Sequence, residues 1–139
     1  MVRKIAVGLV MFFLCVVLSS NTLSMLAANR AEGPDIEEIM KKLNKPKGLH
    51  KAVGKALDAD SVDWATVAPM TKEYAKLAGH LGKNKPEKGG AASWAKLCKA
   101  YADDAAALAA AAGKKDKASA KTAWGKLNKS CQECHDEHR

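Results

Sequence analysis

Acidic and aromatic residues are both scarce in this chain of 139 residues. There are 15 Asp and Glu against 23 Lys and Arg, a formal net charge of +8, and Phe, Trp and Tyr make up 5% of the sequence. A basic chain can bind nucleic acid or an anionic surface. Here the lysines occur in ones and twos with few aromatic residues between them. We expect no nucleic-acid binding. We interpret the lysines either as a solvated helix surface or as a docking face for acidic protein partners.

The chain has one long apolar run, from Ile5 to Leu18. Two basic residues precede this run, and small alanines follow it after a short polar stretch. A run of about 14 apolar residues is short for a membrane span, which needs roughly 20. The pattern is typical of a secretory signal peptide, with an uncleaved anchor as the alternative. We interpret residues 1–28 as a signal peptide and 29–33 as a short N-terminal segment. The protein is then periplasmic or otherwise exported, without stable membrane insertion after signal removal.

Cysteine is also scarce, and the three cysteines that follow the signal region are Cys98, Cys131 and Cys134. Exported proteins often form disulfides. An odd number of cysteines cannot all pair within one chain, and two of these are three residues apart and are followed directly by His135. This spacing indicates a cofactor or metal motif rather than a disulfide framework.

The remainder of the chain shows helical periodicity, interrupted where Gly and Pro cluster. Pro34 suits the start of a first helix, and Pro46 and Gly48 predict that this helix is kinked or split. A second helix begins near Asp60 or Ser61, both good N-cap residues.

Two further helices are predicted after the clearest loop, residues 82–90. The third extends from about 92 to 112, and the fourth follows a break at 113–116. Four helices with short connections predict an all-α, antiparallel four-helix bundle over residues 34–139. Alanine occupies many core positions of this bundle, so its core is thin, and a large flat cofactor would supply the missing apolar contacts.

The fourth helix ends in the motif Cys131-Gln-Glu-Cys134-His135, which is the C-x-x-C-H pattern of covalent haem attachment. Two cysteines one helical turn apart can each bond a vinyl group of the same porphyrin. The histidine after the second cysteine is then placed to bind the iron. We therefore predict one haem c, held by two thioether bonds, with His135 as the proximal iron ligand.

Three other interpretations of the motif remain open. A thioredoxin-like dithiol normally starts a helix after a strand, whereas this motif ends a helix. A zinc site would need four ligands from one short region: Cys131, Cys134, His135 and His138. A disulfide between Cys131 and Cys134 would close a very short loop and add little stability.

The motif at the end of the last helix resembles the class II cytochromes c, the cytochrome c′ and cytochrome c-556 family. The resemblance covers about residues 34–139 and implies a four-helix bundle with C-terminal haem attachment. In this family a basic residue follows the motif, which implies a cofactor-binding role for Arg139. His138 stands where an aromatic residue is usual. Members of the family often form homodimers through their first two helices.

The resemblance also implies two candidates for the sixth position of the iron. In the low-spin branch of the family, a methionine of the first helix binds the iron, and Met40 stands at that position. A His and Met ligand pair suits electron transfer with protein redox partners, some of them acidic. The alternative is an open site that binds NO or CO, in which Met40 is core filler.

Other histidines, methionines and cysteines are weaker ligand candidates. We interpret His50, His80 and Met70 as surface residues, and Cys98 as buried and reduced. Three aromatic residues, Trp94, Tyr101 and Trp124, are predicted to pack in the core or against the porphyrin. Nothing in the sequence supplies an acid–base pair or a nucleophile beside a substrate pocket, so we do not predict an enzyme.

Overall fold

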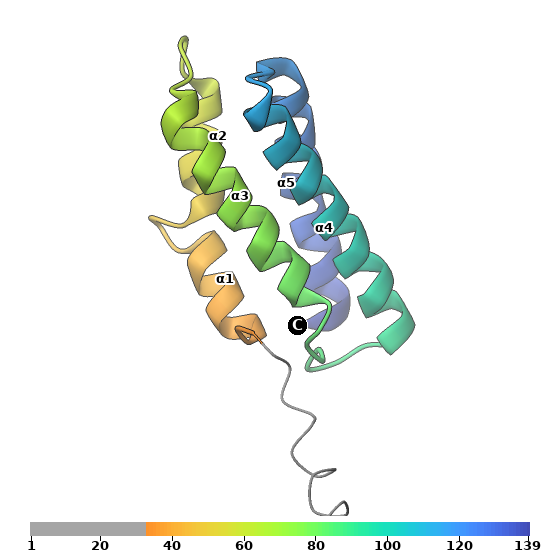
Figure 1. The fold of residues 1–139 in the computed structure, drawn as a ribbon. Coiled ribbons are helices and arrows are strands. Elements are labelled where there is room, and N and C mark those ends of the chain that lie inside the picture. Colours follow the sequence, from red (N-terminus) through yellow and green to blue (C-terminus); the bar gives the residue numbers. More distant parts are fainter. Residues whose placement is uncertain (1–32) are drawn as a thin grey trace, which may run out of the picture. The chain divides into compact units, whose positions relative to one another are not determined.

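A computed structural model describes residues 33–139, and the predicted signal peptide, 1–28, lies outside the described residues. Within residues 33–139 the chain forms helices and no strand, and none of these helices is long and apolar enough to cross a membrane. The helices are α1 (Ile36–Asn44), α2 (Leu49–Asp58), α3 (Trp64–Leu81), α4 (Ala91–Gly113) and α5 (Lys117–His138). Figure 1 shows α1 and α2 following one another beside α3, with α4 and α5 completing the bundle. The all-α four-helix bundle is confirmed, with its first helix split in two.

The split occurs at the predicted proline and glycine. The backbone N–H of Lys45 closes α1 by donating to Lys41 O at 3.3 Å, and Pro46 follows with no N–H to continue the helix. A Cβ at Gly48 would overlap the carbonyl oxygen of Leu43, so only glycine fits where the chain re-enters a helix. Because the break separates the two segments, α1 and α2 can take different distances from the rest of the bundle.

Aspartate side chains start three of the helices. Asp35 accepts from Glu38 N at 2.7 Å, Asp63 from Ala65 N at 3.1 Å, and Asp116 from Ser119 N at 3.1 Å. The predicted start of the second helix at Asp60 or Ser61 is wrong by about one turn. Asp63 caps that helix because its second oxygen also accepts from the Thr66 hydroxyl at 2.7 Å, a partner that neither predicted cap has.

Each helix packs closely on its neighbours in the bundle, but α1 and α5 do not meet. Helix α4 packs along both α3 and α5, while α1 packs on α2 and α3. Helix α2 also reaches α5, where a Cβ at Gly54 would lie 2.5 Å from Trp124 Cζ2. No Cα of α1 lies within 8 Å of α5 in the described structure. The bundle is therefore open on this side, next to the end of α5 that carries the cysteine motif.

Candidate haem site

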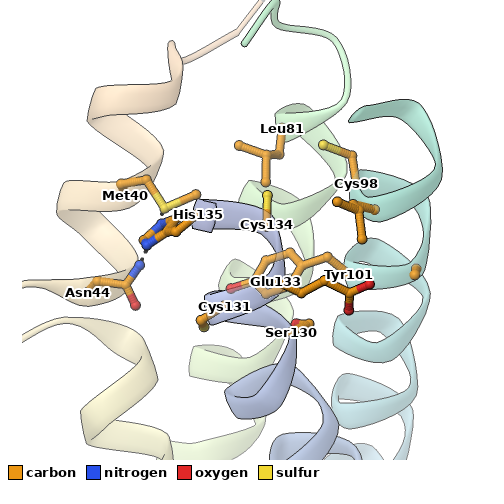
Figure 2. Close-up of a pocket in the computed structure, with 12 residues that line it drawn as sticks. Met40, Asn44, Leu81, Cys98, Tyr101, Ser130, Cys131, Glu133, Cys134 and His135 are labelled. Carbon is orange, nitrogen blue, oxygen red and sulfur yellow. Dashed lines mark hydrogen bonds between the residues drawn. The ribbon is translucent and has the colours of Figure 1, made fainter. Parts of the chain in front are cut away.

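A pocket lies where α1 and α5 fail to meet (Figure 2). It holds about 540 Å³ of unfilled space, which includes the solvent at its open mouth. Four helices contribute to its wall, and most of the lining side chains are apolar or thiol groups. The lining residues are Met40, Asn44, Leu81, Leu97, Cys98, Ala100, Tyr101, Ser130, Cys131, Glu133, Cys134 and His135.

The three residues of the cysteine motif all line this pocket. Cys131, Cys134 and His135 lie on the last turns of α5, and each is partly buried. Both thiols are free, and Cys131 Sγ donates to Leu127 O at 3.3 Å. Burial raises the pKa of both thiols above the ordinary value of 9.0, so they remain protonated near neutral pH. Two free thiols and an imidazole therefore face the same cavity.

Met40 reaches the same pocket from α1, more than ninety positions earlier in the chain. Its side chain is partly buried, and its Sδ accepts a weak hydrogen bond from Asn44 Nδ2 at 3.4 Å. Figure 2 shows the Met40 side chain extending toward the His135 ring. The sulfur and the imidazole thus project into one cavity from two helices whose backbones do not touch.

Cys98 lines the pocket as well, from α4, with 3% of its surface exposed. Burial, together with the nearby Cys134, raises the pKa of the Cys98 thiol to about 12. Cys98 is buried, as predicted, and it forms no disulfide within residues 33–139. Its proximity to the motif was not predicted, because one residue on an apolar helix face does not reveal which residues of another helix it meets.

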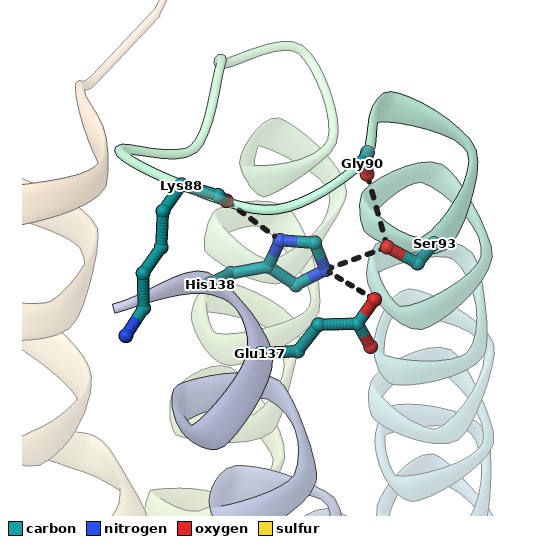
Figure 3. A network of polar contacts seen from close by, with 5 residues as sticks. All are labelled: Lys88, Gly90, Ser93, Glu137 and His138. Carbon is teal, nitrogen blue, oxygen red and sulfur yellow. Dashed lines mark hydrogen bonds and ion pairs between the residues drawn. The ribbon is translucent and has the colours of Figure 1, made fainter.

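The remaining candidate residues at the C-terminus lie outside the pocket. Arg139 is exposed and does not line the pocket, and its backbone N–H donates to His135 O at 3.2 Å. Its predicted contact with the cofactor stays a prediction. His138 is buried between the loop 82–90 and α4 (Figure 3). Its Nδ1 donates to Lys88 O at 3.0 Å and its Nε2 lies 3.2 Å from Ser93 Oγ. His138 therefore anchors the end of α5.

The zinc interpretation has no support in this geometry. Within residues 33–139, no three side chains of His, Cys, Asp or Glu lie together as a metal-binding group. His138 turns toward Lys88 and Trp94, with its ring centroid 5.2 Å from that of the indole, instead of toward the cysteines. The two motif cysteines are not joined by a disulfide either.

The interpretation of His50, His80 and Met70 as surface residues is wrong. All three are partly buried. Met70 packs against the core, and His80 Nδ1 is enclosed without a hydrogen-bond partner in the described structure. His50 stacks on Trp124, with ring centroids 5.1 Å apart, and lies 3.0 Å from the Tyr74 hydroxyl. A polar residue near a helix break resembles a surface residue in sequence, since nothing local reveals its partners on distant helices.

These side chains fit a covalently attached haem. Such a group needs two free thiols one helical turn apart, an imidazole beside them, and apolar surroundings for a flat ring. The pocket provides the thiols of Cys131 and Cys134, the ring of His135, and a mostly apolar wall from α3 and α4. The structure brings Met40 to the same space without help from the cofactor.

Comparison with known proteins agrees with this reading. A family model described as cytochrome C' matches residues 89–139, a segment that contains α4, α5 and the whole cysteine motif. No curated protein and no solved structure matches the chain. Over residues 89–139 the chain is therefore similar to the haem-binding cytochrome C' family, and the all-helical bundle agrees with this similarity.

Proposed function

We propose that the protein is an exported monohaem cytochrome that transfers electrons. Cys131 and Cys134 would hold one haem c by thioether bonds, and His135 and Met40 would bind its iron. When bound, the haem supplies an iron that changes between two oxidation states. The protein holds the group, shields it and sets its potential, and it catalyses no reaction of its own.

The observation that carries this proposal is the composition of one pocket. Met40 comes from α1, and Cys131, Cys134 and His135 come from α5, yet all four line the same cavity. A methionine that served only as core filler would be expected to pack into a closed core. Met40 instead borders open space across from an imidazole. A thioether and imidazole pair favours a raised reduction potential and electron transfer.

The surroundings of the pocket suit this role. Leu81, Leu97 and the buried Cys98 give the inner wall a low polarity, which limits access of water to a bound group. The basic composition of the chain favours encounter with acidic redox partners, chiefly by raising the association rate. Attachment by two covalent bonds keeps the cofactor from being lost after export.

The alternative function is binding of NO or CO at an open iron site. One observation favours it: Met40 Sδ is already hydrogen-bonded to Asn44, and iron ligation competes with that contact. Any coordination by Met40 must be stronger than this bond, and sulfur is a weak acceptor. This contact therefore opposes ligation only weakly.

Absorption spectra of the haem-loaded protein with and without CO separate the two functions. For the unaltered protein we expect a low-spin spectrum that CO does not change, and for Met40→Ala a high-spin spectrum that CO does change. Met70→Ala is the matched control, since Met70 is partly buried but does not line the pocket. If the unaltered protein is high-spin and binds CO, the gas-binding alternative is correct. If it purifies without haem, both functions fail.

A further inference from the structure

A chain of hydrogen bonds leads from the pocket wall to the protein surface. It begins at Tyr101, which lines the pocket, and the hydroxyl oxygens of Tyr101 and Tyr74 lie 2.5 Å apart. The Tyr74 oxygen lies 3.0 Å from His50 Nδ1, and His50 Nε2 lies 3.2 Å from Oδ1 of the exposed Asn128. Four side chains on α4, α3, α2 and α5 thus form one continuous path.

The direction of each bond follows from the two ends of His50. Asn128 Oδ1 can only accept, so His50 Nε2 carries a proton and donates it. In a neutral imidazole the other nitrogen then has no proton, and His50 Nδ1 must accept from the Tyr74 hydroxyl. Because the Tyr74 hydroxyl donates its proton to His50, the Tyr74 oxygen accepts a hydrogen bond from the Tyr101 hydroxyl. The Tyr101 oxygen can then act toward the pocket only as a hydrogen-bond acceptor.

A second proton on His50 reverses this order. His50 Nδ1 would then donate to Tyr74, so the Tyr74 hydroxyl must turn and donate to Tyr101. The Tyr101 hydroxyl then no longer donates to Tyr74, and it can rotate so that its proton points into the pocket. Two hydroxyl rotations are enough, and no helix has to move.

Burial keeps both tyrosine hydroxyls protonated, as this reversal requires. Tyr74 is fully buried and Tyr101 is 8% exposed. Burial raises the pKa of each phenol well above its ordinary value of 10.0. Both hydroxyls therefore retain their protons across the whole range in which histidines change charge, about pH 5 to pH 8.

No other ionisable group competes for His50 in the described part of the chain. The group that faces it from α3 is Tyr74, and α5 presents Asn128 and the Trp124 ring, whose Nε1 donates to the His50 carbonyl oxygen at 3.2 Å. Helix α4 is linked to His50 only through Tyr101, which bonds to Tyr74. Among residues 33–139, no α1 side chain bonds to it, no ion pair includes it, and its neighbour Lys51 is exposed.

We propose that His50, Tyr74 and Tyr101 form a relay that switches Tyr101 from hydrogen-bond acceptor to donor toward the pocket when His50 gains a proton. The effect on the iron rests on the proposed haem function. A donor and a positive charge directed at the pocket favour the reduced, less positive iron. By linkage, reduction then favours protonation of His50, so electron uptake is accompanied by partial proton uptake.

Nuclear magnetic resonance of the full exported chain tests the relay itself, both haem-loaded in the reduced form and unloaded. The ring nitrogens of His50 report its protonation, and the Cζ chemical shift of Tyr101 reports the direction of its hydrogen bond. We expect the Tyr101 signal to change in step with the His50 ring-nitrogen signals as the pH is lowered. In Tyr74→Phe, the His50 signals should still respond to pH while the Tyr101 signal stays constant. His50→Gln, which cannot change charge, should also leave the Tyr101 signal constant.

The relay is overturned if Tyr101 does not respond to pH, or if it still follows His50 in Tyr74→Phe. Because these signals are read with and without haem, the result does not depend on the proposed function. The reduction potential of the loaded protein then tests the coupling. We expect about tenfold tighter proton binding by His50 in the reduced form, which corresponds to a rise of about 59 mV on acidification.

Tyr101→Phe should lose at least half of this rise, and His80→Gln, the matched histidine control, should retain all of it. If Tyr101→Phe retains the full rise, the charge of His50 acts directly on the iron and the relay is not the route. If the potential does not change with pH in the unaltered protein, no coupling exists.

Discussion

Helices α3, α4 and α5 extend through both ends of the bundle, but the two ends are packed in different ways. At the end where α4 connects to α5, small residues such as Ala112 and Ala120 are buried, and the helices approach closely. Two polar contacts between α2 and α5 add to the closure there, because Lys121 pairs with Asp58 at 2.9 Å and Lys117 Nζ donates to Ala59 O at 2.5 Å. At the other end α1 stays away from α5, and the pocket opens between them.

A thin core can therefore serve both stability and binding. Alanine and glycine have little side-chain volume, so they stabilise a core only where the neighbouring helices pack close together. Gly54 allows that approach between α2 and Trp124. Because the chain breaks at Gly48, α1 can lie apart from α5. The pocket between α1 and α5 is left for a group that the chain does not itself provide.

The largest expected effect is at the closed core. Leu108 is fully buried on α4, and Leu108→Ala should lower the free energy of unfolding of the unloaded protein by about 2–5 kcal/mol, because it leaves a cavity. The matched change Leu97→Ala, on the pocket wall, should cost about 1 kcal/mol, since it only widens existing space. Urea unfolding measures both. Equal losses would mean that the pocket end is as tightly packed as the closed end.

The close approach of α2 to α5 is the next feature to test. Gly54→Ala places a methyl group 2.5 Å from Trp124 Cζ2, and we expect a loss of about 1–3 kcal/mol from overpacking. Gly79→Ala on α3 is the control, because nothing lies within 4 Å of its added Cβ and alanine favours the helix by about 1 kcal/mol. Thermal unfolding of both variants measures the difference in their stability. A neutral Gly54→Ala would show that this contact is not required for closure.

Alkaline pH should destabilise the pocket end of the unloaded protein. The folded-state pKa of Cys98 is raised from 9.0 to about 12, so its stabilising contribution is complete below about pH 9 and is lost as the pH rises toward 12. Urea midpoints between about pH 8 and pH 10 should therefore fall, and Cys98→Ala should reduce that fall. The thiols of Cys131 and Cys134 and the phenols of Tyr74 and Tyr101, with pKa values shifted the same way, contribute to the remainder. An identical fall in Cys98→Ala would contradict the assignment.

The smallest effect concerns the helix start at the closed end. Hydrogen bonds from Ser119 lower the pKa of Asp116 below 3.8, so the contribution of this cap is present above that pH and lost as the pH falls further. Asp116→Ala should lower the urea midpoint slightly at neutral pH. Asp116→Asn keeps a capping side chain without its titration, so it should retain most of the neutral stability and lose the acid dependence.

Much of this architecture could be predicted from the sequence, because its signals are local. Helical periodicity and the Gly and Pro clusters indicate the helices, and the split at Pro46 and Gly48 lies where expected. The start of α3 was missed, since Asp60, Ser61 and Asp63 are all acceptable caps and only the bond from Thr66 distinguishes the last. At the pocket, the motif on α5 is contiguous and easily recognised. The contributions of Cys98 and Tyr101, and the role of His50, depend on which helix faces meet, and that is decided by packing across the whole bundle.

Peptide mass spectrometry can locate the attachment site of the haem. Cleavage after lysine and arginine places Cys131 and Cys134 together on the peptide 130–139, while Cys98 falls on the separate peptide 97–99. We expect the protein, purified from an exporting host that attaches haem, to carry one haem mass on the peptide 130–139. Haem on the Cys98 peptide, or both motif cysteines recovered as free thiols, would contradict it.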